Sequence, residues 1–189
     1  MIINLSEDGK FVTVSAFNAP PGMDPSVTLQ ELRAAFPHVE VQFFDGARVA
    51  GAQHLEIAAI NAAHAFNTGI SISRSLAMET LLYASAQRQI EVAIDRLGVR
   101  RESRTIGVVL FSNSRDDAQA LKNRVAQFLK TDLNDALLDD WSEKKTSQIV
   151  ALYGIKTAEL EAIRMPGREA KEAISKAVVE RVALLSTRT

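Results

Sequence analysis

The sequence predicts an α/β fold, in which a small mixed sheet of a few strands packs with many helices and the chain closes in a helical C-terminal tail. Three segments rich in β-branched and aromatic residues are typical of strands: residues 11–17 (FVTVSAF), 39–44 (VEVQFF) and 105–111 (TIGVVLF). Longer segments between and after them repeat apolar residues every three or four positions, which is typical of helices. The 189 residues contain no internal repeat and no flexible linker, so we expect one domain over residues 1–189.

The first part of the chain is expected to alternate strand and helix. Residues 28–31 (TLQE) have the spacing of a capping box, with the threonine as N-cap, so a short helix is expected there and Pro37 ends it. Residues 45–46 (DG) follow the second strand and predict a tight turn, which would form a hairpin if residues 47–49 continue as a strand. Residues 51–66 are rich in alanine and are expected to be helical.

Residues 67–98 are predicted to form one long helix, because their apolar residues fall on two stripes at helical spacing, and Gly98 is expected to end it. A helix that covers a core needs only one apolar face. The second stripe mixes arginine with apolar residues, so we expect it to contact a partner protein, a nucleic acid or the rest of the fold. The inward stripe comprises Leu76, Tyr83, Ile90, Ile94 and Leu97, and the second comprises Arg74, Met78, Leu81, Ser85, Arg88 and Val92.

The C-terminal half is predicted to be one strand followed by helices. Residues 105–111 are almost continuously apolar, as in a central strand covered on both faces. Residues 114–117 (SRDD) have the spacing of another capping box and open a helix. The acidic stretch 132–140 is either a helical extension or a loop. Three further helices are expected at residues 142–153, 157–163 and 168–186.

Charge and composition exclude several classes of protein. The formal net charge is −1, so any binding of nucleic acid must use a local patch rather than a global basic field. The chain has no cysteine, which excludes disulfides and thiolate chemistry and fits a reducing compartment. The N-terminal sequence MIINLSEDGKF is too polar for a signal peptide, and no apolar run approaches the roughly 20 residues that span a bilayer. We therefore expect a soluble, cytoplasmic protein.

The common catalytic motifs are absent from the sequence, so an enzyme is not expected. There is no phosphate-binding loop, no dinucleotide-binding glycine motif and no nucleophile elbow. His38, His54 and His64 have no second ligand at metal-binding spacing, and each is expected at a surface or an interface. We expect no cofactor and no metal.

Carboxylates provide the remaining candidates for chemistry. A buried Glu79 would be a candidate general base with a raised pKa. The favoured interpretation is that Glu79 pairs with an arginine or lies at the edge of its stripe. Asp135, Asp139 and Asp140 would suit a divalent ion, but an acidic helix end or loop is favoured because no glycine makes a sharp turn among them.

Two segments have a functional alternative. Residues 67–74 place glycine and hydroxyl residues before a helix, where N–H groups without helical partners, together with Arg74 and Arg88, would bind a phosphate. The pattern by itself favours an ordinary capped helix. The last helix has an apolar face that its own sheet or a partner subunit must cover.

The pattern S-R-S-L-x-x-E-x-L-L-Y-x-S-x-x-R-Q-I begins at Ser73, and an isoleucine and a glycine follow it. Together with the segments IGVVLF (106–111), ALYGI (151–155) and VVERVALL (178–185), this sequence is similar to the Cgi-type subunit of the KEOPS complex. The eukaryotic member of that family is the PRPK-binding protein, and the archaeal form is the better match. The resemblance covers most of the chain.

That resemblance implies a non-catalytic subunit of a complex that makes threonylcarbamoyladenosine in tRNA. It implies that the chain binds and activates the small atypical kinase/ATPase subunit and recruits tRNA through the single-stranded CCA end. Ser73, Arg74 and Arg88 lie on the shared motif. The residues expected to contact tRNA are Asn67, Thr68, Ser73, Arg74 and Arg88.

The kinase is expected to contact apolar residues of the long helix and the tail, namely Met78, Leu81, Leu184 and Leu185. Two of these share a stripe with the arginines, so the two sets of contacts overlap. Two other classes of function are left as alternatives. One is a module that binds the kinase without contacting RNA, and the other is an enzyme that uses Glu79 as its base.

Overall fold

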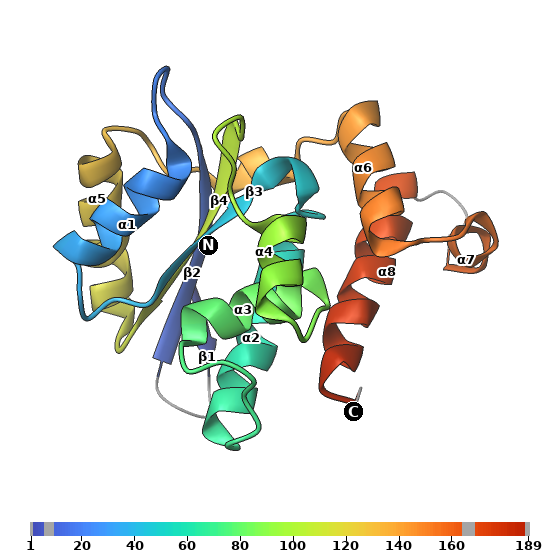
Figure 1. Ribbon diagram of the computed structural model, residues 1–189, viewed down its shortest axis with the longest axis horizontal. Coiled ribbons are helices and arrows are strands. Elements are labelled where there is room, and N and C mark those ends of the chain that lie inside the picture. The colour runs from blue at the N-terminus through green and yellow to red at the C-terminus, as the bar shows by residue number, and fades with distance from the viewer. Residues whose placement is uncertain (1, 6–9, 164–168, 188–189) are drawn as a thin grey trace.

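The computed structural model describes residues 2–5, 10–163 and 169–187, and a four-stranded sheet with helices on both faces forms its centre (Figure 1). The strand order is β1-β2-β4-β3, so β4 is an interior strand, as its apolar sequence predicts. The α/β fold class is confirmed. The sequence predicts a mixed sheet, whereas the described pairings are all antiparallel. The strands are β1 (Ile2–Leu5), β2 (Lys10–Asn18), β3 (Val41–Asp45) and β4 (Thr105–Ser112).

Side chains alternate between the two faces along each strand, and helices bury both faces. On β2, Val12 and Val14 face one hydrophobic cluster, while Phe17 faces the other. Helices α1 (Pro25–Ala35) and α5 (Arg115–Leu129) cover the face of Phe17. Helices α2 (Ala52–Asn67) and α3 (Leu76–Ser85) cover the opposite face (Figure 1). The strands at 11–17, 39–44 and 105–111 and the helix at 51–66 are therefore confirmed, with shifts of one or two residues at their ends.

Helix α1 begins earlier than the capping box predicts. Its N-cap is Asp24, whose carboxylate accepts hydrogen bonds from the backbone N–H groups of Ser26 and Val27. Pro25 occupies the first helical position, where its lack of an N–H costs nothing. Thr28 lies inside the helix and donates its hydroxyl to the Asp24 carbonyl at 2.9 Å. The assignment of Thr28 as N-cap is therefore wrong, because Asp24 followed by Pro25 is the stronger start signal.

The chain does not form a hairpin after β3. Residues 46–48 form a short 3₁₀ helix, η1 (Gly46–Arg48), and Asp45 caps it through the N–H of Ala47. The antiparallel partner of β3 is β4, which is distant in sequence. Turn signals such as Asp-Gly show where the chain bends, but the next segment pairs only if its pattern suits a strand.

The long helix predicted over residues 67–98 is wrong. It is broken into α3 and α4 (Ile90–Leu97), because Ala86 takes the left-handed conformation with φ of 52° and ends α3. The N–H of Gln87 then bonds to the carbonyl of Leu82, which is the closing bond of a Schellman motif. No glycine or proline marks this break in the sequence. Gly98 does end α4, although in an extended conformation.

This break rotates the two stripes relative to each other. Ile90 and Ile94, which the continuous helix places inward, are 42% and 47% exposed. Leu81 and Ser85 of the second stripe are fully buried. Arg88 lies in the connection between the two helices rather than on a helix surface.

The C-terminal half follows the prediction closely. Ser114 caps α5 by accepting from the N–H of Asp117, which confirms the second capping box. The acidic stretch contains a short 3₁₀ helix rather than an open loop, and α8 packs its apolar face on α2 rather than on the sheet. The predicted start at Arg168 lies outside the described residues. The elements are η2 (Asp135–Asp139), α6 (Glu143–Tyr153), α7 (Thr157–Ile163), α8 (Ala170–Ala183) and η3 (Leu184–Thr187).

Among the described residues, none of the helices combines the length and the apolar composition needed to cross a membrane.

Candidate functional site

The two arginines of the shared motif lie at opposite ends of α3. Arg74 precedes the helix and Arg88 follows it, and both are exposed. A helix of 10 residues is about 15 Å long, so the length of α3 separates the two residues along the chain. The expectation that they lie together on one stripe is wrong, because Arg88 is on the loop after the helix. They are instead two separate exposed groups, one at each end of α3.

The N-terminus of α3 is filled by the chain's own groups. The hydroxyl of Ser75 accepts from the N–H of Met78 at 3.3 Å. The carboxylate of Glu40, just before β3, accepts from the N–H of Ala77 at 3.0 Å and from the Ser75 hydroxyl at 2.9 Å. These bonds confirm the interpretation of an ordinary capped helix. The sequence gives no local sign of the Glu40 contact, because Glu40 is 37 positions from Ala77.

Glu79 anchors the loop that leads into α3. Its side chain is 1% exposed and accepts hydrogen bonds from the N–H of Ile72 at 3.0 Å and from that of Ser73 at 2.7 Å. The prediction that Glu79 pairs with an arginine or lies at the stripe's edge is therefore wrong. A carboxylate enclosed in this way cannot reach an external substrate, which removes the only residue on which the enzyme alternative depended. Its position holds the backbone immediately before Arg74.

The polar residues expected to bind RNA differ in what they can offer. Ser73 is 8% exposed, its N–H is used by Glu79, and its hydroxyl donates to the Ser75 carbonyl at 2.6 Å. Thr68 is exposed, and its hydroxyl donates to the His64 carbonyl at 2.8 Å. Asn67 is exposed at the end of α2. The expectation that this loop offers unused backbone donors therefore fails at Ser73.

A buried histidine fixes the other end of α3. His54 is 0% exposed, although a surface or interface position was the expectation. Its Nδ1 accepts from the N–H of Ala50 at 3.1 Å, so the ring proton is on Nε2, which donates to the carbonyl of Ala84 at 2.8 Å. The hydroxyl of Tyr153 donates to the same carbonyl at 2.9 Å. Burial lowers the pKa of His54 to about 4, so the ring is neutral at pH 7.

This network ties α2 and α6 to the last turn of α3, immediately before the loop with Arg88. Its signal in the sequence is the spacing of His54 with the buried alanines Ala58, Ala62 and Ala65, which places the histidine on the inward face of α2.

The four apolar residues expected to bind the kinase fall into two groups. Leu81 and Leu185 are 0% and 1% exposed, so both belong to the core, and the expectation of surface contact is wrong for them in this structure. Met78 is half-buried and packs against the core cluster. Leu184 is 43% exposed at the end of α8.

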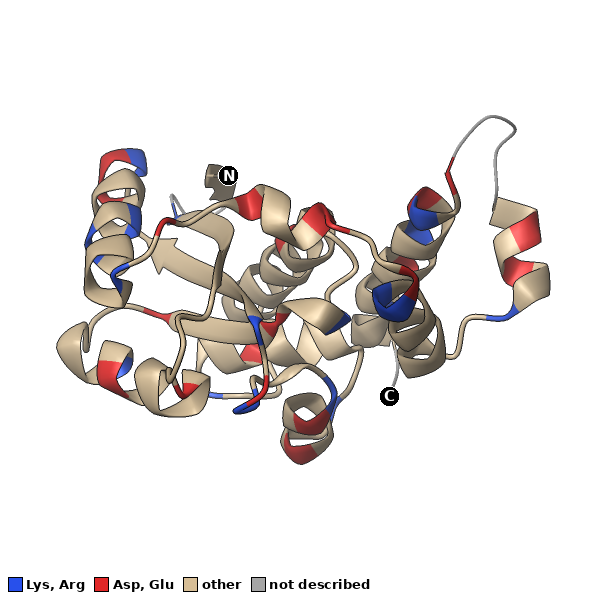
Figure 2. Ribbon diagram, turned by 90° about the horizontal axis from the view of Figure 1, so that it is seen from above, with Lys and Arg blue, Asp and Glu red and all other residues tan. Residues whose placement is uncertain are grey.

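One acidic residue of η2, Asp139, has a structural role. Asp139 accepts a hydrogen bond from the N–H of Ala52 at 3.3 Å and so caps α2, whose own N-cap residue, Gly51, has no side chain. Within the described ranges, no group of three or more histidines and acidic residues could hold a metal ion. Basic and acidic residues are interspersed over the molecule (Figure 2), so a polyanion would have to meet a local cluster.

The fold and these surfaces define an α/β protein in which the two exposed candidate arginines flank α3 and the exposed Leu184 lies at the end of α8. The model of a protein family described as kinase binding protein CGI-121 matches residues 24–186. Since this is most of the chain, the protein belongs to that family, and the Cgi-type resemblance of the motif is confirmed at this level. No curated protein matches the sequence.

Proposed function

We propose that the chain is the Cgi-type regulatory subunit of an archaeal KEOPS complex, acting in the cytoplasm and without catalytic activity of its own. It binds and activates the small kinase/ATPase subunit, and it recruits tRNA through the single-stranded CCA end. Membership of a kinase binding family supports the first role. The exposed arginines at the two ends of α3 support the second.

The arrangement of Arg74 and Arg88 carries the proposal for RNA. A single strand is held by a few phosphate contacts and by stacking, at points spread along its length. Two arginines at the opposite ends of a helix that is about 15 Å long suit such a strand better than they suit one isolated phosphate. Each is on a short loop that a buried group fixes, Glu79 for the first and His54 for the second. Asn67, Thr68 and the partly enclosed Ser73 would add contacts on the side of Arg74.

The kinase contact is proposed at Met78 and Leu184, which retain accessible surface. Leu81 and Leu185, which follow them in the sequence, are buried in the core and support the helices from within. Because α8 packs on α2 and α3, a partner that binds the tail would contact an element next to α3, whose flanking loops hold the arginines. That placement would couple kinase binding to the RNA surface.

Replacement of Arg88 by glutamate tests the RNA contact. A hydrogen bond to a charged group contributes about 1.5–3 kcal/mol, so Arg88→Glu is expected to weaken tRNA binding at least tenfold at low salt. Arg115→Glu is the matched control, because Arg115 is exposed on α5 at the opposite face of the sheet. Equal affinities of Arg88→Glu and wild type in a titration with tRNA would remove Arg88 from the site.

A second function has one observation in its favour. Glu40 and Glu79 place two carboxylates at the N-terminus of α3, where they repel phosphate and occupy its donors. A module that binds the kinase without contacting RNA would show this arrangement. Stable kinase binding together with no detectable tRNA binding by the wild-type chain would select this alternative.

A further inference from the structure

A polar cleft of about 350 Å³ lies at the C-terminal end of α4, which is the end opposite Arg88. It is enclosed by η1, the segment 98–104 and the start of α6. Asp45 and Glu102 are its acidic residues. Basic residues outnumber them, which gives the cleft a positive balance that the whole molecule lacks. The basic residues of its lining are Arg48, Arg100, Arg104, Lys144 and Lys145.

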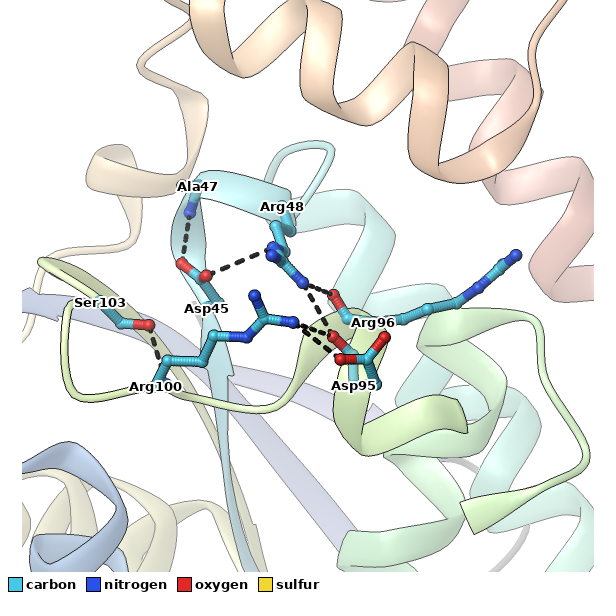
Figure 3. Close-up of polar contacts among 7 residues, drawn as sticks. All are labelled: Asp45, Ala47, Arg48, Asp95, Arg96, Arg100 and Ser103. Atoms are coloured by element: carbon cyan, nitrogen blue, oxygen red, sulfur yellow. Dashed lines mark hydrogen bonds and ion pairs between the residues drawn. The ribbon is translucent and has the colours of Figure 1, made fainter. Parts of the chain in front are cut away.

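Two guanidinium groups in this cleft are fixed by the end of α4. Arg48 donates to the carbonyls of Asp95 at 2.8 Å and Arg96 at 2.9 Å. Arg100 donates to the Asp95 carbonyl at 2.6 Å and to the Asp95 carboxylate at 3.0 Å. Figure 3 shows both side chains converging on the last turn of α4 from different segments. The helix carbonyls carry partial negative charge and hold both cations in place, while the carboxylates of Asp95 and Asp45 offset part of their charge.

These bonds leave donors for a ligand. A guanidinium has five N–H groups, and the bonds to α4 use one terminal nitrogen of Arg48 and one of Arg100. The Nε of Arg48 faces Asp45 at 3.5 Å, which orients the group further. Such a preorganised pair matches the tetrahedral oxygens of a phosphate, which arginine binds in a bidentate manner. Arg104 and Lys144 are exposed at the rim.

The cleft continues the surface proposed for RNA. Arg88 precedes α4, while Arg100 follows it, and α4 has 8 residues and a length of about 12 Å. That is the rise of about three to four stacked nucleotides on one strand of a duplex. Between the two ends, Arg96 reaches back to the carbonyl of Ser85 at 3.3 Å. A second hollow of about 420 Å³ shares Arg48 and Arg100 and extends the cleft along α6.

We propose that this cleft binds the phosphate backbone of the tRNA acceptor arm next to its CCA end, as a second RNA contact. The inference rests on the proposed function. A phosphodiester backbone is favoured over an acidic protein segment because apolar side chains are few in the lining, whereas protein interfaces depend on aromatic and apolar anchors. The cleft offers what the phosphates of a strand require, which is fixed guanidinium groups and an exposed lysine at the rim.

Charge reversal at the rim tests this contact without breaking the bonds to α4. Lys144→Glu is the test variant, and Arg115→Glu is its matched control. Both residues are exposed in the first turn of a helix, where glutamate is compatible with the helix dipole. Each protein is titrated with full-length tRNA over a range of salt concentrations and with a short single-stranded oligonucleotide that ends in CCA. Thermal melts verify that both variants fold.

Lys144→Glu is expected to weaken tRNA binding about three- to tenfold, to lower the slope of log Kd against log salt by about one, and to leave the oligonucleotide affinity unchanged. Arg115→Glu is expected to change none of the three. Identical tRNA affinities of the two variants would overturn the cleft contact while leaving the CCA contact intact. A Lys144→Glu defect confined to kinase binding would assign the cleft to an acidic protein segment. Absence of any tRNA binding by the wild type would refute the RNA role as a whole.

Discussion

Lowering the pH is expected to reduce the stability of the fold through His54, a buried group whose protonation the fold opposes. His54 is fully buried, accepts a hydrogen bond at Nδ1 and donates one from Nε2, so the fold suits the neutral ring. A second proton would occupy Nδ1 and face the Ala50 N–H. Burial lowers the pKa of His54 from 6.5 to about 4 in the folded chain.

The sign and size of the effect follow from this difference in pKa. Between the two values the unfolded chain binds a proton at His54 and the folded chain does not, so stability falls as the pH falls. The contribution is complete above pH 6.5 and is lost as the pH drops toward 4. For these pKa values the loss amounts to about 2 kcal/mol at about pH 5, or roughly a thirtyfold change in the unfolding equilibrium.

Urea unfolding at about pH 7.5 and about pH 5 measures the loss, and variants separate His54 from the carboxylates. His54→Gln cannot take up the proton, so its stability is expected to fall about 2 kcal/mol less than that of the wild type over this interval. Tyr153→Phe removes one bond to the Ala84 carbonyl but keeps the imidazole, so it should retain the wild-type pH dependence. If wild type and His54→Gln lose the same free energy of unfolding, the neutral buried histidine is not what the pH change acts upon.

Three further substitutions test individual contacts. Glu79→Gln keeps the shape of the side chain but offers only one acceptor oxygen. It should therefore lower the free energy of unfolding in urea by about 1–3 kcal/mol and speed amide exchange at Ile72. Unchanged exchange would contradict the anchoring role. Gly51 and Gly22 both have positive φ, but only a Cβ on Gly51 would meet a neighbour, at 2.6 Å from Asp139. Gly51→Ala should therefore lower the melting temperature more than Gly22→Ala. Equal effects would refute the clash. Glu159→Gln weakens the paired hydrogen bonds to Arg181 that join α7 to α8. Amide hydrogen exchange should therefore accelerate in α7 while the sheet stays protected. Slow exchange in α7 would show that other contacts hold this helix.

The sequence predicted those parts of the fold that depend on local chemistry. The run at residues 105–111 identifies an interior strand because both of its faces are apolar, and Ser114 with Asp117 identifies a helix start because the cap bonds span three residues. The C-terminal helices were found in the same way. β1 was missed because four residues at a sheet edge carry too little periodicity.

The errors arise where a distant contact decides the outcome. Ala86 ends α3 in a left-handed conformation that alanine does not favour, and the His54 and Tyr153 bonds to the neighbouring Ala84 carbonyl help to hold the chain there. Glu40 fills the N-terminus of α3 from another segment. Arg74 and Arg88 are exposed, as contact with an external partner requires, but their separation by a full helix depends on the break at Ala86.

The most direct measurement of the central claim compares two ligands on one protein. The purified wild-type chain is titrated with a tRNA that carries its CCA end and with the same tRNA after enzymatic removal of those three nucleotides. If Arg74 and Arg88 bind the single-stranded end, the protein should bind the intact tRNA at least tenfold more tightly than the trimmed tRNA at low salt. Equal affinity for the two tRNAs would contradict recruitment through the CCA end.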